Sequence, residues 1–148
     1  MRGYLLRPAK ASGRMPGVVV VDDNRDLNLC IEDVARHVAK AGFVALAPDT
    51  LSSVDGYPGN DDEGRRLQQR GDPQKLMNHF FDPIEYLQAS ELTTDKIGFI
   101  GCCCGGRQDQ RDHVYPGTNH GFHNDPTPRY DEAATQLAWD RTLAGFQC

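Results

Sequence analysis

A cysteine set among glycines is the first feature of this sequence with the character of a reactive site. Residues 101 to 106 read Gly-Cys-Cys-Cys-Gly-Gly, which places Cys103 in the pattern Gly101-x-Cys103-x-Gly105. Glycines on both sides permit a sharp strand-to-helix turn that leaves the central side chain exposed, the geometry of a nucleophile elbow. Backbone N–H groups and the start of the following helix favour a thiolate there. The pattern predicts a nucleophile at Cys103; the alternative is that all three cysteines are small core residues.

A histidine in a glycine-containing loop is the matching candidate for a general base. His120 lies in the stretch Tyr-Pro-Gly-Thr-Asn-His-Gly-Phe-His at residues 115 to 123, after a short strand candidate at residues 113 to 115. At the C-terminal edge of a sheet, its imidazole could take the proton of Cys103. The alternative is a solvated surface histidine with no catalytic task.

The acid that would orient His120 is missing from the interval in which it is expected, between the nucleophile and the histidine. Only 17 positions separate Cys103 from His120, whereas a single crossover connection already takes about a dozen residues. Asp109 and Asp112 lie in this interval, but neither follows a strand-like run. We therefore expect the segment that bears the acid to be deleted.

The elements that must position these residues follow from two kinds of apolar pattern. Short apolar runs predict strands, and apolar residues three and four positions apart predict helices. The expected strands are Val18 to Val21, Phe43 to Pro48 and Lys96 to Gly101; the expected helices are residues 31 to 41, a helix that starts at Asp72 and Pro73, and Tyr130 to Phe146. Strand, helix and strand in succession predict an α/β fold with a largely parallel sheet.

Some single positions carry expectations of their own. The helix after Asp72 has an apolar face made of Met77, Phe80, Phe81, Ile84 and Leu87. Pro83 inside this helix is expected to bend or break it, and Trp139 is expected in the core. Asp49 is interpreted as a cap or turn residue. Arg65, Arg66 and Arg70 could hold a substrate carboxylate, but a solvated helix face is the preferred interpretation.

Length and composition restrict the class of protein and its partners. The 148 residues are 39% hydrophobic, which suits one globular domain, and carry a net charge of −5, which argues against nucleic acid as a partner. The longest uninterrupted run of large apolar residues, Val18 to Val21, is far too short to cross a membrane, and the N-terminus does not have the pattern of a signal peptide. The expected location is the cytoplasm, and the five cysteines are expected to be reduced thiols.

Several stretches together resemble the dienelactone hydrolase family, α/β-hydrolases with a Cys-His-Asp triad. The matching stretches follow one another along the chain: Gly17 to Val21 with Asn24 and Arg25, Ile31 to Ala35, Gly42 to Asp49, the segment around Cys103, and Tyr115 to Phe122. Because they cover nearly the whole chain in order, the combination is far more specific than any one motif.

This resemblance implies hydrolysis of a small ester or lactone through a thioester, without metal or organic cofactor. Cys103 would be the nucleophile and His120 the general base. The backbone N–H groups of Asn24 and Cys104 would form the oxyanion hole, which stabilises charge that appears only in the transition state. Asp23 takes the place of a family glutamate beside the thiol and is one methylene shorter.

The departures from the family pattern concern the acid of the triad. Its segment is expected to be deleted between Gly106 and Arg111, which makes residues 1 to 148 a single truncated α/β-hydrolase domain that lacks several elements of its C-terminal half. Without the acid the histidine has no fixed tautomer, so we expect activity to be weak or lost. The missing strands would also leave a sheet edge open to self-association.

Three other interpretations remain open. The chain could be a catalytically inactive remnant of the family. The run Val18 to Val21 followed by Asp22 and Asp23 also resembles the start of a receiver domain, in which paired acids bind Mg²⁺. Finally, Cys102, Cys104, His120 and His123 are residue types that bind zinc, although they lack the usual spacing.

Overall fold

The protein is described here by a computed structural model in which two parts of the chain form compact units, Met1–Gln108 and Asp109–Cys148. The structure describes residues 2–21, 27–52, 56–101, 115–119, 121–123, 125 and 127–146.

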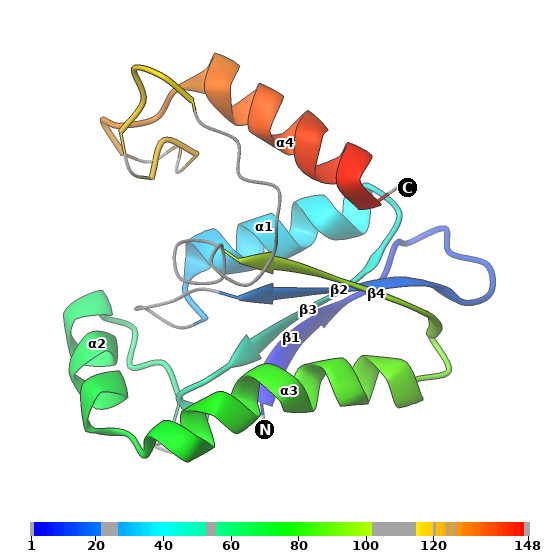
Figure 1. The fold of residues 1–148 in the computed structure, drawn as a ribbon, viewed down its shortest axis with the longest axis horizontal. Helices are drawn as coiled ribbons and strands as arrows, with labels where there is room; N and C mark the ends of the chain where they lie inside the picture. The colour runs from blue at the N-terminus through cyan, green and yellow to red at the C-terminus, as the bar shows by residue number, and fades with distance from the viewer. Residues whose placement is uncertain are drawn as a thin grey trace. The chain divides into compact units, whose positions relative to one another are not determined.

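The first unit contains a four-stranded sheet with the strand order β1-β3-β2-β4 (Figure 1). The strands are β1 (Arg2–Leu6), β2 (Met15–Val21), β3 (Val44–Asp49) and β4 (Thr93–Gly101). Strand β2 is parallel to both of its neighbours, β3 and β4, whereas β1 is antiparallel to β3. The expectation of a mostly parallel sheet is confirmed, and β1 adds an antiparallel edge strand that the apolar pattern did not predict.

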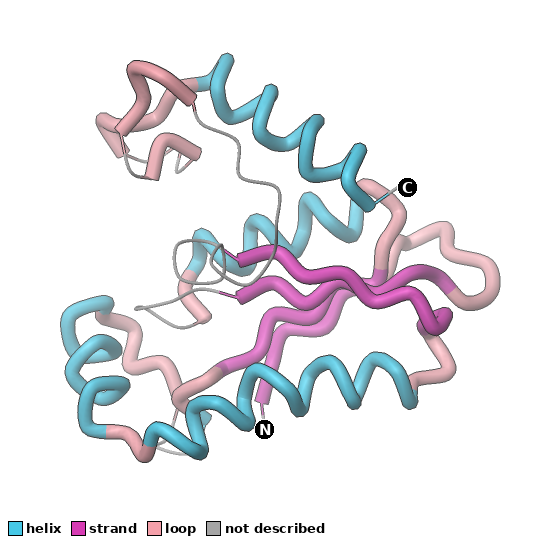
Figure 2. The backbone as a smooth tube through the Cα atoms, in the orientation of Figure 1, coloured by secondary structure: helices cyan, strands magenta, loops and turns pink. Residues whose placement is uncertain are grey.

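Helices cover both faces of this sheet. Helix α1 (Leu29–Lys40) packs against β1, β2 and β3, and helix α3 (Pro73–Ala89) packs against β2, β3 and β4. Figure 2 shows the two helices on opposite sides of the strands. A third helix, α2 (Asp61–Arg70), follows the loop after β3 and is absent from the helices expected from the apolar pattern.

The core lies where both faces of the sheet are covered. Val18, Val19, Val20 and Val21 are all almost completely buried. Because successive residues of a strand point to opposite faces, their burial requires packing on both sides, as the uninterrupted apolar run predicted. Gly17 lies at a tight point of this core: a Cβ there would come within 2.8 Å of Ile97 Cδ1 and 3.2 Å of Leu87 Cδ1. The missing side chain therefore lets β2, β4 and α3 come close together.

Helix α3 departs from expectation at two positions. It continues through Pro83, so of the two expected effects, a bend or a break, the break does not occur. The ring of Pro83 is fully buried, and burial of apolar surface offsets part of the lost backbone hydrogen bond. On the expected apolar face, Leu87 is buried and Ile84 packs against the core, but Phe81 is 56% exposed.

The second unit contains helix α4 (Glu132–Phe146) and the described part of the loop before it. The helix confirms the expected C-terminal helix, with a start two residues later. None of its residues is fully buried, and Trp139 is only half-buried, so the expectation of a core tryptophan is wrong. An α-helix that buries no residue completely receives little stabilisation from packing.

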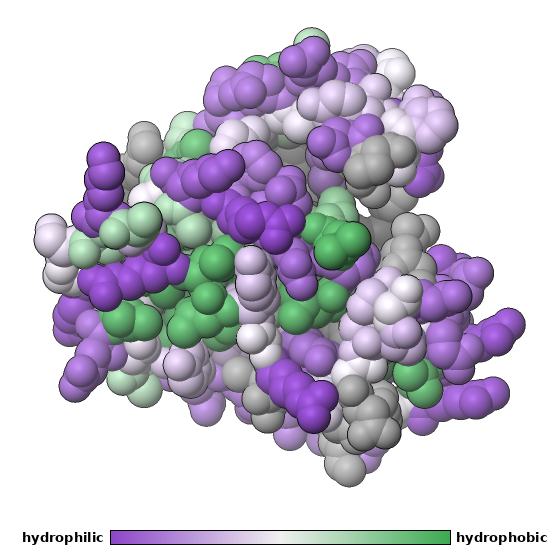
Figure 3. Space-filling model, turned by 180° about the vertical axis from the view of Figure 1, so that it is seen from behind, coloured by the Kyte–Doolittle hydropathy of each residue, from purple (hydrophilic) through white to green (hydrophobic). Residues whose placement is uncertain are grey.

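Apolar side chains also reach the surface. Figure 3 shows green apolar patches on one face among purple polar residues. The exposed large hydrophobic residues are Leu5, Leu29, Phe81, Tyr86, Phe99, Tyr130 and Leu137. Two of them, Leu5 on β1 and Phe99 on β4, belong to the outer strands of the described sheet, which are the strands available to a further partner strand.

Candidate active site at the C-terminal edge of the sheet

In the register between β2 and β4, the two strand ends that precede the candidate catalytic segments lie side by side. Val21, the last residue of β2, is the direct partner of Gly101, the last residue of β4. Asp23 follows Val21 by two positions and Cys103 follows Gly101 by two positions. Since the strands are parallel, both segments leave the sheet at its C-terminal edge, where open α/β sheets bind their ligands.

The candidate catalytic and oxyanion residues themselves lie outside the described part of the chain. These residues are Asp23, Asn24, Cys103, Cys104 and His120. The same holds for Asp22 of the receiver interpretation, for Cys102 of the zinc interpretation, and for Asp109 and Asp112. The structure describes the strands and helices that precede and follow these candidate residues in the sequence.

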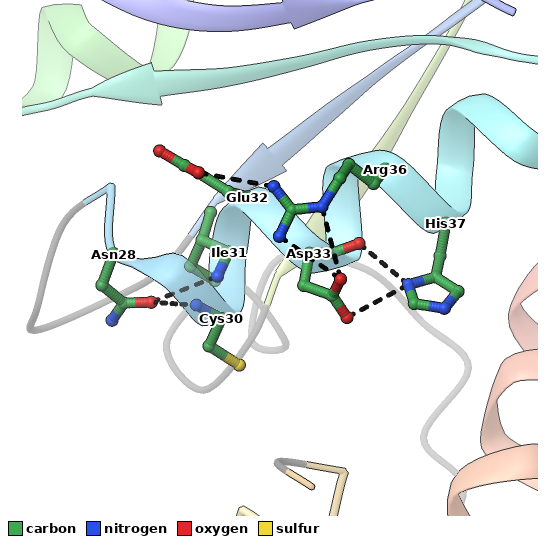
Figure 4. A network of polar contacts seen from close by, with 7 residues as sticks. All are labelled: Asn28, Cys30, Ile31, Glu32, Asp33, Arg36 and His37. Atoms are coloured by element: carbon green, nitrogen blue, oxygen red, sulfur yellow. Dashed lines mark hydrogen bonds and ion pairs between the residues drawn. The ribbon is translucent and has the colours of Figure 1, made fainter. Parts of the chain in front are cut away.

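Helix α1 begins shortly after the segment that carries Asp23 and Asn24. Asn28 is its N-cap: the side-chain oxygen accepts hydrogen bonds from the backbone N–H groups of Cys30 at 3.0 Å and Ile31 at 3.1 Å (Figure 4). Such a cap satisfies donors that have no partner within the helix. The segment 22 to 26 is thus bounded by a buried strand on one side and a capped helix on the other.

A polar network follows on the exposed side of α1. Arg36 lies 3.4 Å from Glu32 and 3.3 Å from Asp33, and His37 lies 3.2 Å from the carboxylate of Asp33 (Figure 4). A side-chain hydrogen bond with Tyr4 raises the pKa of Arg36 above its usual value, and Asp33 adds to this effect. Because these groups are largely exposed, the ion pairs contribute little to stability. The contact with Tyr4 connects the helix to strand β1.

Asp49 ends strand β3 at the same edge and is 7% exposed. Its Oδ2 lies where a side chain on Gly56 would collide, 2.7 Å from the position of a Cβ, and Gly56 has a φ of +90°. The N–H of Gly56 donates to the carbonyl of Leu51 at 2.9 Å. The carboxylate therefore lies against the turn that follows β3, but Asp49 itself is the last residue of the strand and pairs with Arg2, so it is not the cap or turn residue that was expected.

The loop that contains position 120 is described on both sides of that position. The carbonyl of Tyr115 accepts from the N–H of Thr118 at 3.3 Å and from its hydroxyl at 2.8 Å. The N–H of Phe122 donates to the carbonyl of Asn119 at 3.1 Å. The stretch from 119 to 122 is therefore closed by a turn hydrogen bond across the candidate base.

Helix α4 holds the far end of this loop. The carbonyl of Phe122 accepts from the N–H of Asp131 at 2.9 Å and from the hydroxyl of Thr135 at 3.1 Å. Sequence reasoning did not single out Asp131 or Thr135. No local pattern could have revealed the second contact, because it joins residues 13 positions apart.

Aromatic contacts support the same loop. The rings of Tyr115 and Phe122 lie 5.2 Å apart, and the ring of His123 lies edge-on to Phe122 at 6.0 Å. The guanidinium of Arg141, in the third turn of α4, lies 5.3 Å from the centre of the Tyr115 ring, within reach of a cation–π interaction. Both ends of the described loop are thus in contact with α4.

The remaining candidates show no binding geometry among the described residues. Arg65 and Arg70 are exposed on α2, and Arg66 pairs with Glu63 of the same helix at 3.3 Å. No group of three histidine, cysteine or acidic residues within the described ranges could hold a metal ion. In the same ranges, none of the helices has the length and apolar character needed to span a membrane.

Comparison with a solved structure identifies the fold. A crystal structure of a protein from Klebsiella pneumoniae subsp. pneumoniae MGH 78578, named as a dienelactone hydrolase, matches with a TM-score of 0.80. The match covers 98% of this chain and 92% of that chain at 17% sequence identity. The α/β-hydrolase fold expected from the sequence is confirmed.

Curated relatives match only part of their own length. A protein of Escherichia coli (strain K12) named as the hydrolase fragment YghX is 71% identical over 73 residues, 49% of this chain and 62% of that protein. A protein of Bradyrhizobium sp named as a 2-oxo-3-(5-oxofuran-2-ylidene)propanoate lactonase is 35% identical over 70% of this chain and 42% of that protein. A Synechocystis sp. protein named as a carboxymethylenebutenolidase is 32% identical over 70% and 45%. The chain spans less than two thirds of each.

The model of one protein family matches this chain in two segments, residues 1–110 and 108–148. These segments meet where the two compact units divide, at Gln108 and Asp109. They also meet inside the interval from Gly106 to Arg111, where the sequence predicted a deletion. Since the two segments together extend over the whole chain, this protein belongs to the dienelactone hydrolase family.

Proposed function

We propose that this protein is a hydrolase of small carboxylic esters or lactones that uses Cys103 as nucleophile and His120 as general base, with weak activity. The observation that carries the proposal is the pairing of Val21 with Gly101. It starts the segments of Asp23, Asn24 and Cys103 from adjacent positions at one edge of a parallel sheet. An elbow nucleophile needs its oxyanion donors within hydrogen-bond reach of the reacting carbonyl.

In the proposed reaction, His120 takes the proton of the Cys103 thiol, and the thiolate attacks the ester carbonyl. The C–O bond then breaks as His120 gives this proton to the leaving oxygen, which departs as an alcohol or, in an enol-lactone, stays attached to the acyl group as an enol. Water attacks the thioester while His120 accepts one of its protons, and the C–S bond breaks, so that the carboxylic acid is released and the thiol is regenerated with the proton from His120. The N–H groups of Asn24 and Cys104 would stabilise the negative oxygen of each tetrahedral intermediate. Asp23 would influence how readily the thiol ionises.

The low activity in this proposal follows from the missing acid. In a triad the acid holds the imidazole in one tautomer and stabilises its protonated form, and its loss costs orders of magnitude in rate. The family match and the compact units both divide where this acid is expected. The alternative that this division favours is an inactive remnant, which keeps the fold and has no turnover.

The substrate class is proposed from the relatives. Two of them carry names that denote lactone hydrolysis, a lactonase and a carboxymethylenebutenolidase. We therefore infer an enol-lactone as the substrate type, with simple activated esters as practical probes.

The test compares the rate of p-nitrophenyl acetate hydrolysis by the purified chain with that of Cys103→Ala. Cys102→Ala is the matched control, because it removes a neighbouring thiol of the same tripeptide. The proposal predicts a small rate that Cys103→Ala abolishes and Cys102→Ala keeps. Equal rates in all three proteins would overturn the hydrolase proposal and leave the inactive remnant.

A further inference from the structure

We propose that Thr135 is a positioning residue, which holds the loop of the candidate base against helix α4 through the carbonyl of Phe122. The inference rests on the proposed function, in which His120 moves the proton. It assigns a role to a helix that carries none of the residues expected to take part in the chemistry.

The anchor is a pair of donors that converge on one acceptor. The carbonyl oxygen of Phe122 accepts from the N–H of Asp131 at 2.9 Å and from the Thr135 hydroxyl at 3.1 Å. One donor is the backbone N–H of Asp131, directly before α4, and the other is the side-chain hydroxyl of Thr135, near the start of this helix. Two bonds to the same oxygen restrict its direction more than either bond alone.

The start of α4 is held by two hydrogen bonds to Asp131. Asp131 precedes the helix, and its Oδ1 accepts from the N–H of Ala134 at 2.9 Å, which makes it a helix cap. Its carbonyl accepts from the N–H of Thr135 at 2.9 Å. Thr135 is thus bonded to Asp131 through its backbone and to Phe122 through its side chain. The loop is tied to a regular, capped helix end.

From Phe122 the hydrogen bonds continue to Asn119, which directly precedes the candidate base in the sequence. The N–H of Phe122 donates to the carbonyl of Asn119 at 3.1 Å, so the carbonyl and the N–H of Phe122 are both engaged. The contact of the Phe122 ring with Tyr115 at 5.2 Å acts on the other end of the loop. Position 120 lies between these two bonded residues.

This restraint is expected to matter for catalysis because proton transfer depends on distance. A general base must come within about 3 Å of the atom whose proton it takes, and a displacement of about 1 Å can cost up to roughly 100-fold in rate. Because the proposed function lacks the orienting acid, restraint of the loop backbone is expected to matter more for the position of the imidazole. The hydroxyl of Thr135 donates to this backbone from helix α4.

The experiment compares three single substitutions in the full chain. Thr135→Val removes the hydroxyl at nearly constant shape, and Thr135→Ser keeps it. Thr142→Val is the matched control, because the Thr142 hydroxyl donates to the carbonyl of Ala138 at 2.9 Å within the same helix. For each protein, kcat and KM are measured with p-nitrophenyl acetate, and amide hydrogen exchange is measured at Phe122 and Asp131.

The expected result is a fall in kcat of about tenfold for Thr135→Val with KM unchanged. Thr135→Ser should restore most of the rate, and Thr142→Val should match the wild type. The Phe122 and Asp131 amides should exchange faster in Thr135→Val than in Thr142→Val, because each amide donates within the anchored loop. Equal kcat in the two valine variants would overturn the proposal.

Failure of the proposed function gives a different pattern. If the wild-type chain and Cys103→Ala have the same rate, the hydrolase proposal fails, and the exchange measurement alone decides whether Thr135 restrains the loop. Equal exchange at Phe122 and Asp131 in Thr135→Val and Thr142→Val would then overturn the inference as well.

Discussion

Single side chains of the first unit differ sharply in how much they contribute to its stability. Leu87 on α3 is completely buried in a cluster with Val19, Val21, Val44 and Leu46. Leu29, at the start of α1, is 79% exposed. The same residue type therefore occupies both extremes of burial within one unit, which permits a controlled comparison.

Leu87→Ala is expected to lower the free energy of unfolding by about 2–5 kcal/mol, since it removes buried methyl groups and leaves a cavity. Leu29→Ala should change it by less than about 0.5 kcal/mol. Urea titrations followed by circular dichroism measure both values. Similar losses in the two variants would show that the cluster around Leu87 does not form the core.

The candidate nucleophile and base belong to this scale. Cys103 and His120 were predicted from short motifs, in which the glycines beside them are part of the signal, and they stay predictions. Thr135 has no such motif, because its relevance comes from the carbonyl of Phe122, 13 positions away. A contact between a hydroxyl and a distant backbone oxygen cannot be detected from residue types or from their spacing.

Helix α1 is the element next to the segment of Asp23 and Asn24, and its start depends on one side chain. Asn28 accepts hydrogen bonds from two backbone N–H groups of the first turn. These donors have no partner inside the helix, so removal of the cap acts on the helix end beside the candidate oxyanion residue.

Asn28→Ala should therefore destabilise the chain by about 1 kcal/mol, within the range of about 0.5–2 kcal/mol measured for lost caps. Asn28→Asp keeps a capping oxygen and should remain close to the wild type. Thermal unfolding of the two variants side by side checks this. A stability of Asn28→Ala equal to that of Asn28→Asp would contradict the role of the cap.

Prediction of whole elements succeeded where the pattern was strong. The strands around Val18 to Val21 and Phe43 to Pro48 and the helix that starts at Pro73 were all recognised. Strand β1 was missed because it is a short edge strand whose signal is weak without its neighbour β3. Helix α2 was missed because its sequence is almost entirely polar, so it has no apolar stripe to detect.

At the scale of the whole molecule, the outer strands of the described sheet bear on whether two copies of the chain associate. In the described sheet β4 is an outer strand, and its last five residues, 97 to 101, carry no charge and no proline. Phe99 in this stretch is 37% exposed. Natural edge strands are protected by charge, proline or a cover, so we propose that two copies of the chain associate through β4.

Phe99→Lys should shift the chain towards monomer, because a charge at an edge strand opposes pairing. Leu5→Lys is the matched control, since Leu5 lies on the opposite outer strand, β1, with a nearly equal exposure of 36%. Sedimentation velocity over a range of protein concentrations measures the effect. A wild-type chain that stays monomeric at all concentrations, with a sharp thermal transition at high temperature, would contradict the proposed association.

The sequence by itself determined the fold class, the main strands and helices, and the family. These properties depend on local patterns and on the order of motifs, both of which can be read from the sequence. Tertiary structure decided which distant residues meet: Val21 beside Gly101 at one sheet edge, β1 antiparallel to β3, and Thr135 bonded to Phe122. It also decided that Pro83 stays within its helix, since the burial of its ring depends on packing. Such contacts form through register and packing between separate segments, and neither composition nor periodicity specifies them.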